Sequence, residues 1–418
     1  MFLNKIAIYF KLLLVSCSIL LSSHSFSFQE NAVLQWQDIL LEAEQIKDTT
    51  PAQALLLLNK LENILSSISI EGQIKYYQLQ AEVHLEQRSF HRAEKLASIG
   101  LELTQQLPMK NQIISELYYT RGFAVESLGD FKGAVADYSN GLVLAESLNN
   151  QEQIAYGLLN LGAIHYLKGK YDASLSVLNK ALKIANNLEN DDLLGNVTSE
   201  LGILYGYLGQ PDESLSFHQR SFEHFSNINK IHSVIGSLTN IANNHASNKR
   251  YNEAISIYKK ILNDKTDSTN EASLYMVYSG MAWAQLSKKD SDPELAHQYI
   301  LIAGQYVTDV EQHEAKLIYT IDHAYILDGM ERYEDALAIV YQAEAMLALR
   351  EENQATLLRL NLLKIKSQIY KKQGKFKLAY EVQGQYLKNY SQVKQKANSE
   401  FILNLRLGYE NEHLKVAK

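Results

Sequence analysis

Apolar and polar positions recur along this chain with a period of about forty residues. An aromatic residue followed three positions later by alanine or serine recurs at Phe90, Phe131, Tyr171, Tyr251, Tyr333 and Phe376. A small residue precedes it by nine or ten positions, as at Gly162 and Gly202, and a glycine such as Gly169 stands between them. Short side chains let two helices pack ~8–10 Å apart. Each period therefore predicts an apolar first helix, a turn and an amphipathic second helix.

The register of this pattern predicts nine units. They start near Gln35, Ile74, Ser115, Ala155, Gly195, Ile235, Val277, Leu317 and Leu360. The prolines test this register independently, because proline is tolerated in the first helical turn and disrupts a helix interior. Pro51, Pro211 and Pro293 fall where a second helix should begin, and Pro108 falls between two units. We therefore expect one all-α solenoid over residues 35–395, where length alone suggests about three globular domains.

These units resemble the tetratricopeptide repeat (TPR) in its forty-residue form. Residues 158–182 carry the resemblance best, with the run LLNLG, then Gly169-Lys170-Tyr171, and finally Ala181-Leu182. The resemblance implies a TPR superhelical solenoid of helix-turn-helix repeats. In this family the first helix of each repeat lines a concave face, which binds protein or peptide partners.

The N-terminal residues 1–27 are typical of an export signal. Lys5 and Lys11 precede a ten-residue apolar run, and the serine-rich stretch 22–27 offers small residues for a signal peptidase. We therefore expect a periplasmic or secreted protein of a bacterial envelope. The run Leu14-Val15-Ser16-Cys17 resembles a lipobox, so lipidation of Cys17 is an alternative. An uncleaved N-terminal anchor is another.

Composition and motifs argue against several kinds of chemistry. The net charge of -7, without a long basic run, argues against nucleic acid as a partner. Cys17 is the only cysteine, which excludes an intramolecular disulfide and a cysteine-rich metal site. The sequence has no phosphate loop, dinucleotide fingerprint, zinc-binding helix or nucleophile elbow. His84, His165 and His245 share one repeat column, and we interpret them as half-buried packing residues. We expect no catalytic residues, cofactor or metal.

The predicted first helices bring polar and aromatic residues to the concave face. The candidate partner-binding residues are Tyr119, Phe123, Tyr156, Asn160, Tyr166, Asn196, Glu200, Tyr207, Asn240, Asn243, Asp322 and Tyr325. Asn160 and Asn240 stand in one column, and an amide both donates to and accepts from a peptide backbone. The alternative is that these asparagines only cap and solvate the groove. The face offers acids where a carboxylate clamp needs Lys or Arg, so acidic C-terminal peptides are not expected ligands.

Residues 396–418 are predicted to form a helical tail. Tyr386, Tyr390, Phe401 and Tyr409 belong to one apolar stripe that is compatible with a coiled-coil seam and a homodimer. The segment 404–412 resembles the one that follows the repeats in TPR sensor regions of membrane-tethered bacterial diguanylate cyclases and histidine kinases. The alternative function is therefore a periplasmic sensory region in signal transduction, whose output domain is absent from this chain.

Overall fold

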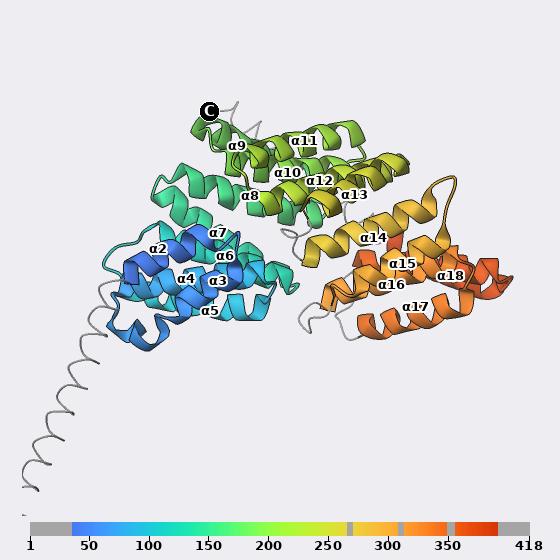
Figure 1. Cartoon of the computed structure of the whole chain (residues 1–418), viewed down its shortest axis with the longest axis horizontal. Coiled ribbons are helices and arrows are strands. Elements are labelled where there is room, and N and C mark those ends of the chain that lie inside the picture. The colour runs from blue at the N-terminus through green and yellow to red at the C-terminus, as the bar shows by residue number, and fades with distance from the viewer. Residues whose placement is uncertain (1–35, 266–270, 308–312, 349–355, 392–418) are drawn as a thin grey trace, which may run out of the picture. The chain divides into compact units, whose positions relative to one another are not determined.

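A computed structural model describes residues 36–265, 271–307, 313–348 and 356–391 of this 418-residue chain. Within these ranges the regular elements are helices (Figure 1). The chain divides into two compact units, Met1–Leu144 and Ala145–Lys418. The predicted export signal with Cys17 and the predicted tail 396–418 lie outside the described residues.

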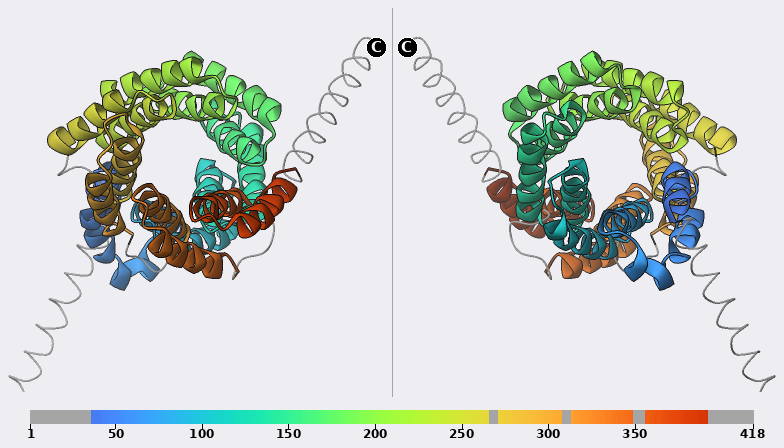
Figure 2. Two further views of the ribbon diagram at one scale, coloured as in Figure 1. Left: turned by 90° about the vertical axis from the view of Figure 1, so that its right-hand side faces the viewer. Right: turned by 90° about the vertical axis from the view of Figure 1, so that its left-hand side faces the viewer.

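The helices follow one another in pairs in both units. The first unit holds α2 (Trp36–Ile46), α3 (Pro51–Asn59), η1 (Glu62–Ser67, 3₁₀), α4 (Ile70–Glu86), α5 (Phe90–Leu103), η2 (Thr104–Gln106, 3₁₀), α6 (Gln112–Ser127) and α7 (Phe131–Ser147), which crosses into the second unit at Ala145. The second unit holds α8 (Gln151–Leu167), α9 (Tyr171–Leu188), α10 (Asp191–Tyr207), α11 (Pro211–Asn227), α12 (Ile231–Ser247), α13 (Tyr251–Lys265), α14 (Glu271–Ser287), α15 (Pro293–Gly304), α16 (His313–Gly329), α17 (Tyr333–Ala348), α18 (Thr356–Lys372) and a helical stretch over 376–391. Figure 2 shows α8 to α13, coloured green to yellow, as neighbouring pairs. The described ranges thus contain the nine predicted helix pairs.

Each second helix begins at the residue that the periodic pattern marks. The aromatic residues Phe90, Phe131, Tyr171, Tyr251 and Tyr333 are the first residues of α5, α7, α9, α13 and α17. The small residue three positions later is fully buried, as at Ala93, Ala134 and Ala254. Ser174 occupies this position in α9, where its hydroxyl donates a 2.7 Å hydrogen bond to the carbonyl of Gly162. The small residue therefore marks the point where the two helices of a pair come close.

The prolines lie where the register requires them. Pro51, Pro211 and Pro293 occupy the first turn of α3, α11 and α15. In that turn proline sacrifices no helical hydrogen bond, and its fixed φ angle suits the helix. Pro108 falls between η2 and α6, outside any helix. The proline test of the register is therefore confirmed.

The turns repeat with the same period as the helices. Between the helices of a pair, Gly129, Gly169, Gly209 and Gly374 have φ angles of +70° to +90°, a region where glycine avoids the strain that a Cβ atom brings. Lys249 adopts the same left-handed conformation in the corresponding turn, with a φ of 62°. Between one pair and the next, Asn149, Glu189 and Asn229 have φ angles of 54°, 51° and 54°. Both kinds of turn therefore recur every forty residues in this part of the chain.

Glycines on the first helices receive large side chains from the second helices. A Cβ atom on Gly122 would lie 2.5 Å from the Tyr138 ring, and one on Gly162 would lie 2.6 Å from Leu178. Tyr138 and Leu178 are both fully buried. The close approach predicted at the small residues is confirmed in these repeats, where the large side chains pack around it.

Candidate functional site

The first helices of the second unit form a layer of their own. Helix α8 contacts α10, α12 contacts α14, and α14 contacts α16, in addition to the contacts within pairs. In α12, residues Gly236, Asn240, Asn243 and Ser247 are spaced by four, three and four positions and are all at least partly exposed. Such spacing places side chains on one face of a helix. Most of this stripe faces away from the second helices, because the residues between its members are mostly buried, although Asn243 still reaches Tyr258 of α13.

The same face recurs on the neighbouring first helices. We call it the first-helix face; it consists of Tyr156, Asn160, Ala163 and Leu167 of α8, Asn196, Glu200, Ile203 and Tyr207 of α10, Gly236, Asn240, Asn243 and Ser247 of α12, Met276, Gly280, Trp283 and Ser287 of α14, and Ile318, Asp322 and Tyr325 of α16. All of these side chains or glycines are at least partly exposed. The face carries two acidic residues and no Lys or Arg.

Asn160 and Asn240 hold equivalent places on this face, two repeats apart. Both side chains are partly exposed. Within the described part of the chain neither amide makes a hydrogen bond, whereas Asn243 accepts one from the Tyr258 hydroxyl. An amide group offers two donors and a carbonyl acceptor. Asn160 and Asn240 therefore keep their full hydrogen-bonding capacity available to a ligand.

Aromatic and acidic side chains form a cluster on α8, which carries Asn160, and on the next first helix, α10. The Tyr166 hydroxyl donates a 2.7 Å hydrogen bond to Oε2 of Glu200. The ring of Tyr207 stacks on Tyr166 and on Tyr171, with centroid distances of 5.4 and 6.3 Å. Tyr166 itself is buried, while Tyr207 is exposed. Although part of the Tyr207 side chain is exposed, desolvation of its hydroxyl, together with Tyr171 and Glu200, raises the pKa of that hydroxyl, which stays protonated at neutral pH. Glu200 and Tyr207 are thus held in place before any ligand arrives.

Tyr156 and Asn196 meet at the start of α10. The Tyr156 hydroxyl donates to Oδ2 of Asp192 at 3.0 Å, and the Asn196 amide donates to the backbone carbonyl of the same residue at 2.8 Å. Lys230 pairs with Oδ1 of Asp192 at 2.7 Å. These two predicted residues are therefore tied into a polar network, unlike Asn160 and Asn240.

The two candidates of the first unit lie on α6 in different surroundings. Phe123 is exposed. Tyr119 is buried, and its ring lies so close to Gly141 of α7 that a Cβ atom on that glycine would overlap it. Tyr119 is therefore a packing residue, which differs from the exposed position that we expected for it.

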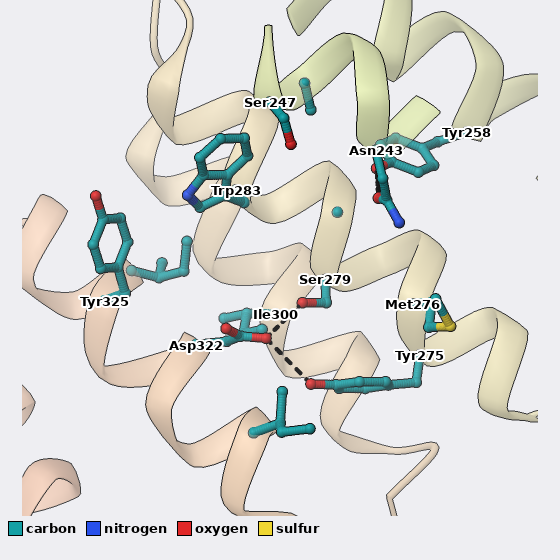
Figure 3. A pocket seen from close by; sticks show the side chains of 14 residues that line it. Asn243, Ser247, Tyr258, Tyr275, Met276, Ser279, Trp283, Ile300, Asp322 and Tyr325 are labelled. Carbon is teal, nitrogen blue, oxygen red and sulfur yellow. Dashed lines mark hydrogen bonds between the residues drawn. The ribbon is translucent and has the colours of Figure 1, made fainter. Parts of the chain in front are cut away.

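Asn243, Asp322 and Tyr325 come together at a cavity of about 370 Å³ in the second unit. Its walls come from α12 to α16, and Figure 3 shows the side chains that line it. Besides the three predicted residues, the lining includes Tyr258, Tyr275, Met276, Ser279 and Trp283. The repeat register could have revealed Trp283, which stands forty residues after Asn243 in the same column. The cavity opens on the first-helix face.

Asp322 is the acidic group of this cavity. Oδ2 of its carboxyl accepts hydrogen bonds from the Ser279 hydroxyl at 2.8 Å and from the Tyr275 hydroxyl at 3.2 Å (Figure 3). Burial raises the pKa of Asp322, and the two hydrogen bonds oppose that rise. Burial and the nearby Asp322 charge both raise the pKa of Tyr275. The tyrosine is thus a neutral donor, and the carboxyl is oriented by two fixed partners.

The histidine column behaves as packing rather than as a ligand set. His84 is buried, and burial lowers its pKa to about 4. His165 and His245 are partly buried, and burial lowers the pKa of each. The described residues contain no group of three or more His, Cys, Asp or Glu placed to hold a metal ion.

A family model matches part of the chain. Residues 153–227, which span α8 to α11, match the family model of the tetratricopeptide repeat. Residues 153–227 carry tetratricopeptide repeats. The sequence of the chain matches none of the curated proteins. Among the described helices, none combines the length and the hydropathy needed to cross a membrane.

Solved structures share the TPR solenoid fold at low sequence identity. A Rap protein in complex with competence and sporulation factor is 13% identical, with a TM-score of 0.53, over 87% of this chain and 99% of that one. NprR in complex with its cognate peptide NprX is 16% identical, with a TM-score of 0.50, over 81% and 99%. Aspartyl phosphate phosphatase F from Bacillus subtilis is 16% identical, with a TM-score of 0.50, over 86% and 94%. These similarities establish the solenoid fold of this chain.

Proposed function

We propose that this protein is an exported, non-enzymatic TPR scaffold that binds a peptide or an extended segment of a partner protein on its first-helix face. The observation that carries the proposal is the pair Asn160 and Asn240. Both amides are partly exposed, equivalent in register and without hydrogen bonds in the described part of the chain. A peptide backbone offers the alternating donors and acceptors that such amides can bind.

The solved structures support this kind of partner. NprR was solved with its cognate peptide, and the fold of this chain resembles that structure over most of both proteins. The first-helix face also joins apolar and aromatic side chains to a few polar groups, which is typical of ligand-binding surfaces.

Panning a random dodecapeptide display library on the full-length protein tests the proposal. Selected peptides are synthesised, and their affinity is measured by fluorescence anisotropy. The double variant Asn160→Ala/Asn240→Ala is expected to bind at least about tenfold more weakly, because each lost hydrogen bond costs about 1 kcal/mol. Asn186→Ala is the matched control, since Asn186 is exposed on the second helix α9. Equal affinities for the double variant and the wild type would refute the assignment of this face.

Export is a separate part of the proposal and rests on residues 1–27. Cell fractionation followed by N-terminal sequencing of the mature protein tests it. Cleavage near Ser25 or Ser27 is expected for ordinary secretion. A lipoprotein would instead lose membrane association in the variant Cys17→Ser, and retention of the intact protein in the cytoplasm would refute export.

A sensory region is the second candidate function, and the end of the last described helix favours it. Tyr380, Leu387 and Tyr390 of the stretch 376–391 are exposed. Their exposure suggests that this helix pairs with a second copy of the chain, and Tyr390 also belongs to the apolar stripe seen in the sequence. Sedimentation of the full chain and of the double variant Leu387→Lys/Tyr390→Lys tests this candidate. A monomer in both cases would argue against it.

A further inference from the structure

The cavity at Asp322 contains a negative charge without a counter-ion. Both of its hydrogen bonds end on Oδ2, from Ser279 and Tyr275, and the described residues give Oδ1 no partner. No ion pair joins this carboxyl to a basic side chain in the part of the chain that the structure describes. Because withdrawing a carboxylate even partly from water without a cation is costly, a site that keeps one is suited to receive a cation from outside.

Aromatic rings flank the same carboxyl. Trp283 and Tyr325 are 37% and 39% exposed, so their surfaces are available at the cavity. Figure 3 shows these two rings on one side of Asp322 and the Tyr275 ring on the other. The Trp283 ring packs edge to face with the Tyr251 ring, and their centroids are 5.8 Å apart. A cation over the face of an indole or phenol ring gains about 0.5–2 kcal/mol.

The size and the position of the cavity fit a side chain better than a free ion. About 370 Å³ is far more than a metal ion needs, and among the residues that the structure describes Asp322 is the only carboxylate that lines this cavity. Met276 and Ile318 supply apolar surface for a methylene stem. The cavity also opens on the first-helix face, which carries acids but no basic residue.

We propose that this cavity is a specificity pocket for a basic side chain, lysine or arginine, of the peptide bound along the first-helix face. The Asp322 Oδ1 atom pairs with the ammonium or guanidinium group, and Trp283 and Tyr325 pack against its stem and its charge. The inference rests on the proposed peptide-binding function and specifies the chemistry of the ligand. A guanidinium would pair with the carboxylate and stack on Trp283, whereas an ammonium would act as a point charge.

Peptide display tests the pocket for a basic side chain separately from peptide binding on the first-helix face. Selected peptides are expected to share a Lys or Arg at one fixed position. Replacing it by norleucine or citrulline should weaken binding at least about tenfold, as loss of a charge-assisted contact does. Asp322→Asn should cause a similar loss, whereas Asp212→Asn, on the exposed start of α11, should cause none. Peptides that bind in an Asn160- and Asn240-dependent manner without a basic residue would overturn the pocket but leave the proposed function intact.

A second probe tests the pocket without any selected peptide. The chain has two tryptophans, so the variant Trp36→Phe leaves Trp283 as its only indole. N-acetyl-arginine amide is expected to change Trp283 emission in a saturable manner, and the neutral citrulline analogue is expected not to. Asp322→Asn and Tyr325→Leu should each remove the response while the helical circular dichroism stays unchanged. Equal responses to both compounds, or no response in the Trp36→Phe protein, would overturn the inference.

Discussion

The imidazole ring of His218 in α11 lies directly against the backbone of Gly202 in α10. A Cβ atom on Gly202 would come within 2.5 Å of Nδ1 of this ring. One repeat earlier, Leu178 lies against Gly162 in the same way. His218 is thus a polar residue in a position built for an apolar one, and burial lowers its pKa to about 4.

The substitution Gly202→Ala is expected to destabilise the protein. His218 is buried and cannot move aside freely, so the added methyl group forces the two helices apart. Overpacking of this kind costs about 1–3 kcal/mol. The melting temperature followed by circular dichroism measures the effect.

Gly236→Ala is the matched control for that substitution. Gly236 also lies inside a helix, α12, but no atom lies within 4 Å of a Cβ atom built on it. Alanine should therefore raise stability by about 0.5–1 kcal/mol through helix propensity alone. A lower melting temperature for Gly236→Ala would contradict the packing argument.

Acid is expected to destabilise the fold through His218. From about pH 7.5 upward the histidine is neutral in both the folded and the unfolded chain, so it contributes no pH dependence there. Because the folded pKa is about 4, the unfolded chain takes up the proton first as the pH falls from about 6.5 to 4. At pH 5 this favours unfolding by about 2 kcal/mol.

The variant His218→Leu should remove this share of the acid sensitivity. Leucine fills the equivalent position at Leu178, so the variant is expected to fold and to lose less stability between pH 7.5 and pH 5 than the wild type. Melting curves at both values measure the difference. An unchanged pH dependence would show that His218 does not titrate in the folded state as expected.

Substituting only one partner of the Arg121–Asp137 ion pair is expected to destabilise the fold strongly. Nε and Nη2 of Arg121 donate to the two carboxylate oxygens at 2.8 and 2.6 Å, and Asp137 is buried. Arg121→Met leaves this carboxylate buried and unpaired, at a cost of about 3–5 kcal/mol. Adding Asp137→Leu should restore a substantial part of the stability. A double variant as unstable as the sum of the single ones would contradict this coupling.

Ser174→Ala is expected to be nearly neutral. Ser174 donates to the Gly162 carbonyl, but alanine fills the same position in most other repeats, and a small residue is all that the helix crossing requires. The predicted change in unfolding free energy is below about 1 kcal/mol. Ser174→Val is the informative counterpart, because its extra methyl groups should destabilise the closely packed crossing.

Much of the fold follows from the sequence because its strongest signals are steric. A proline such as Pro211 can begin a helix but cannot lie inside one, and a glycine such as Gly169 can adopt a positive φ angle without strain. At position 162 only a glycine leaves room for Leu178. These constraints act locally, so they can be read one repeat at a time. They locate the helix pairs and their turns without any knowledge of the neighbouring repeats.

The candidate site follows only in part from the sequence, because an error of one position turns a helical residue by 100°. Asn160 and Asn240 lie on the first-helix face, as the register predicts. Tyr166 stands one position before Leu167 of the first-helix face. Tyr119 stands one position before Thr120, which corresponds to Asn160 one repeat later. Both tyrosines are buried. The free oxygen of Asp322 could not be predicted, since it depends on bonds from Ser279 and Tyr275 that span more than forty residues.

The left-handed turns at Asn149, Glu189 and Asn229 make the repeats interchangeable as segments of chain. Each turn has nearly the same φ angle, and forty residues separate one from the next. Excising residues 190–229 would join Glu189 to Lys230 through a turn of unchanged geometry. In a gene, an in-frame duplication or loss of 120 base pairs at these points would lengthen or shorten the first-helix face by one repeat and leave the left-handed turn in place.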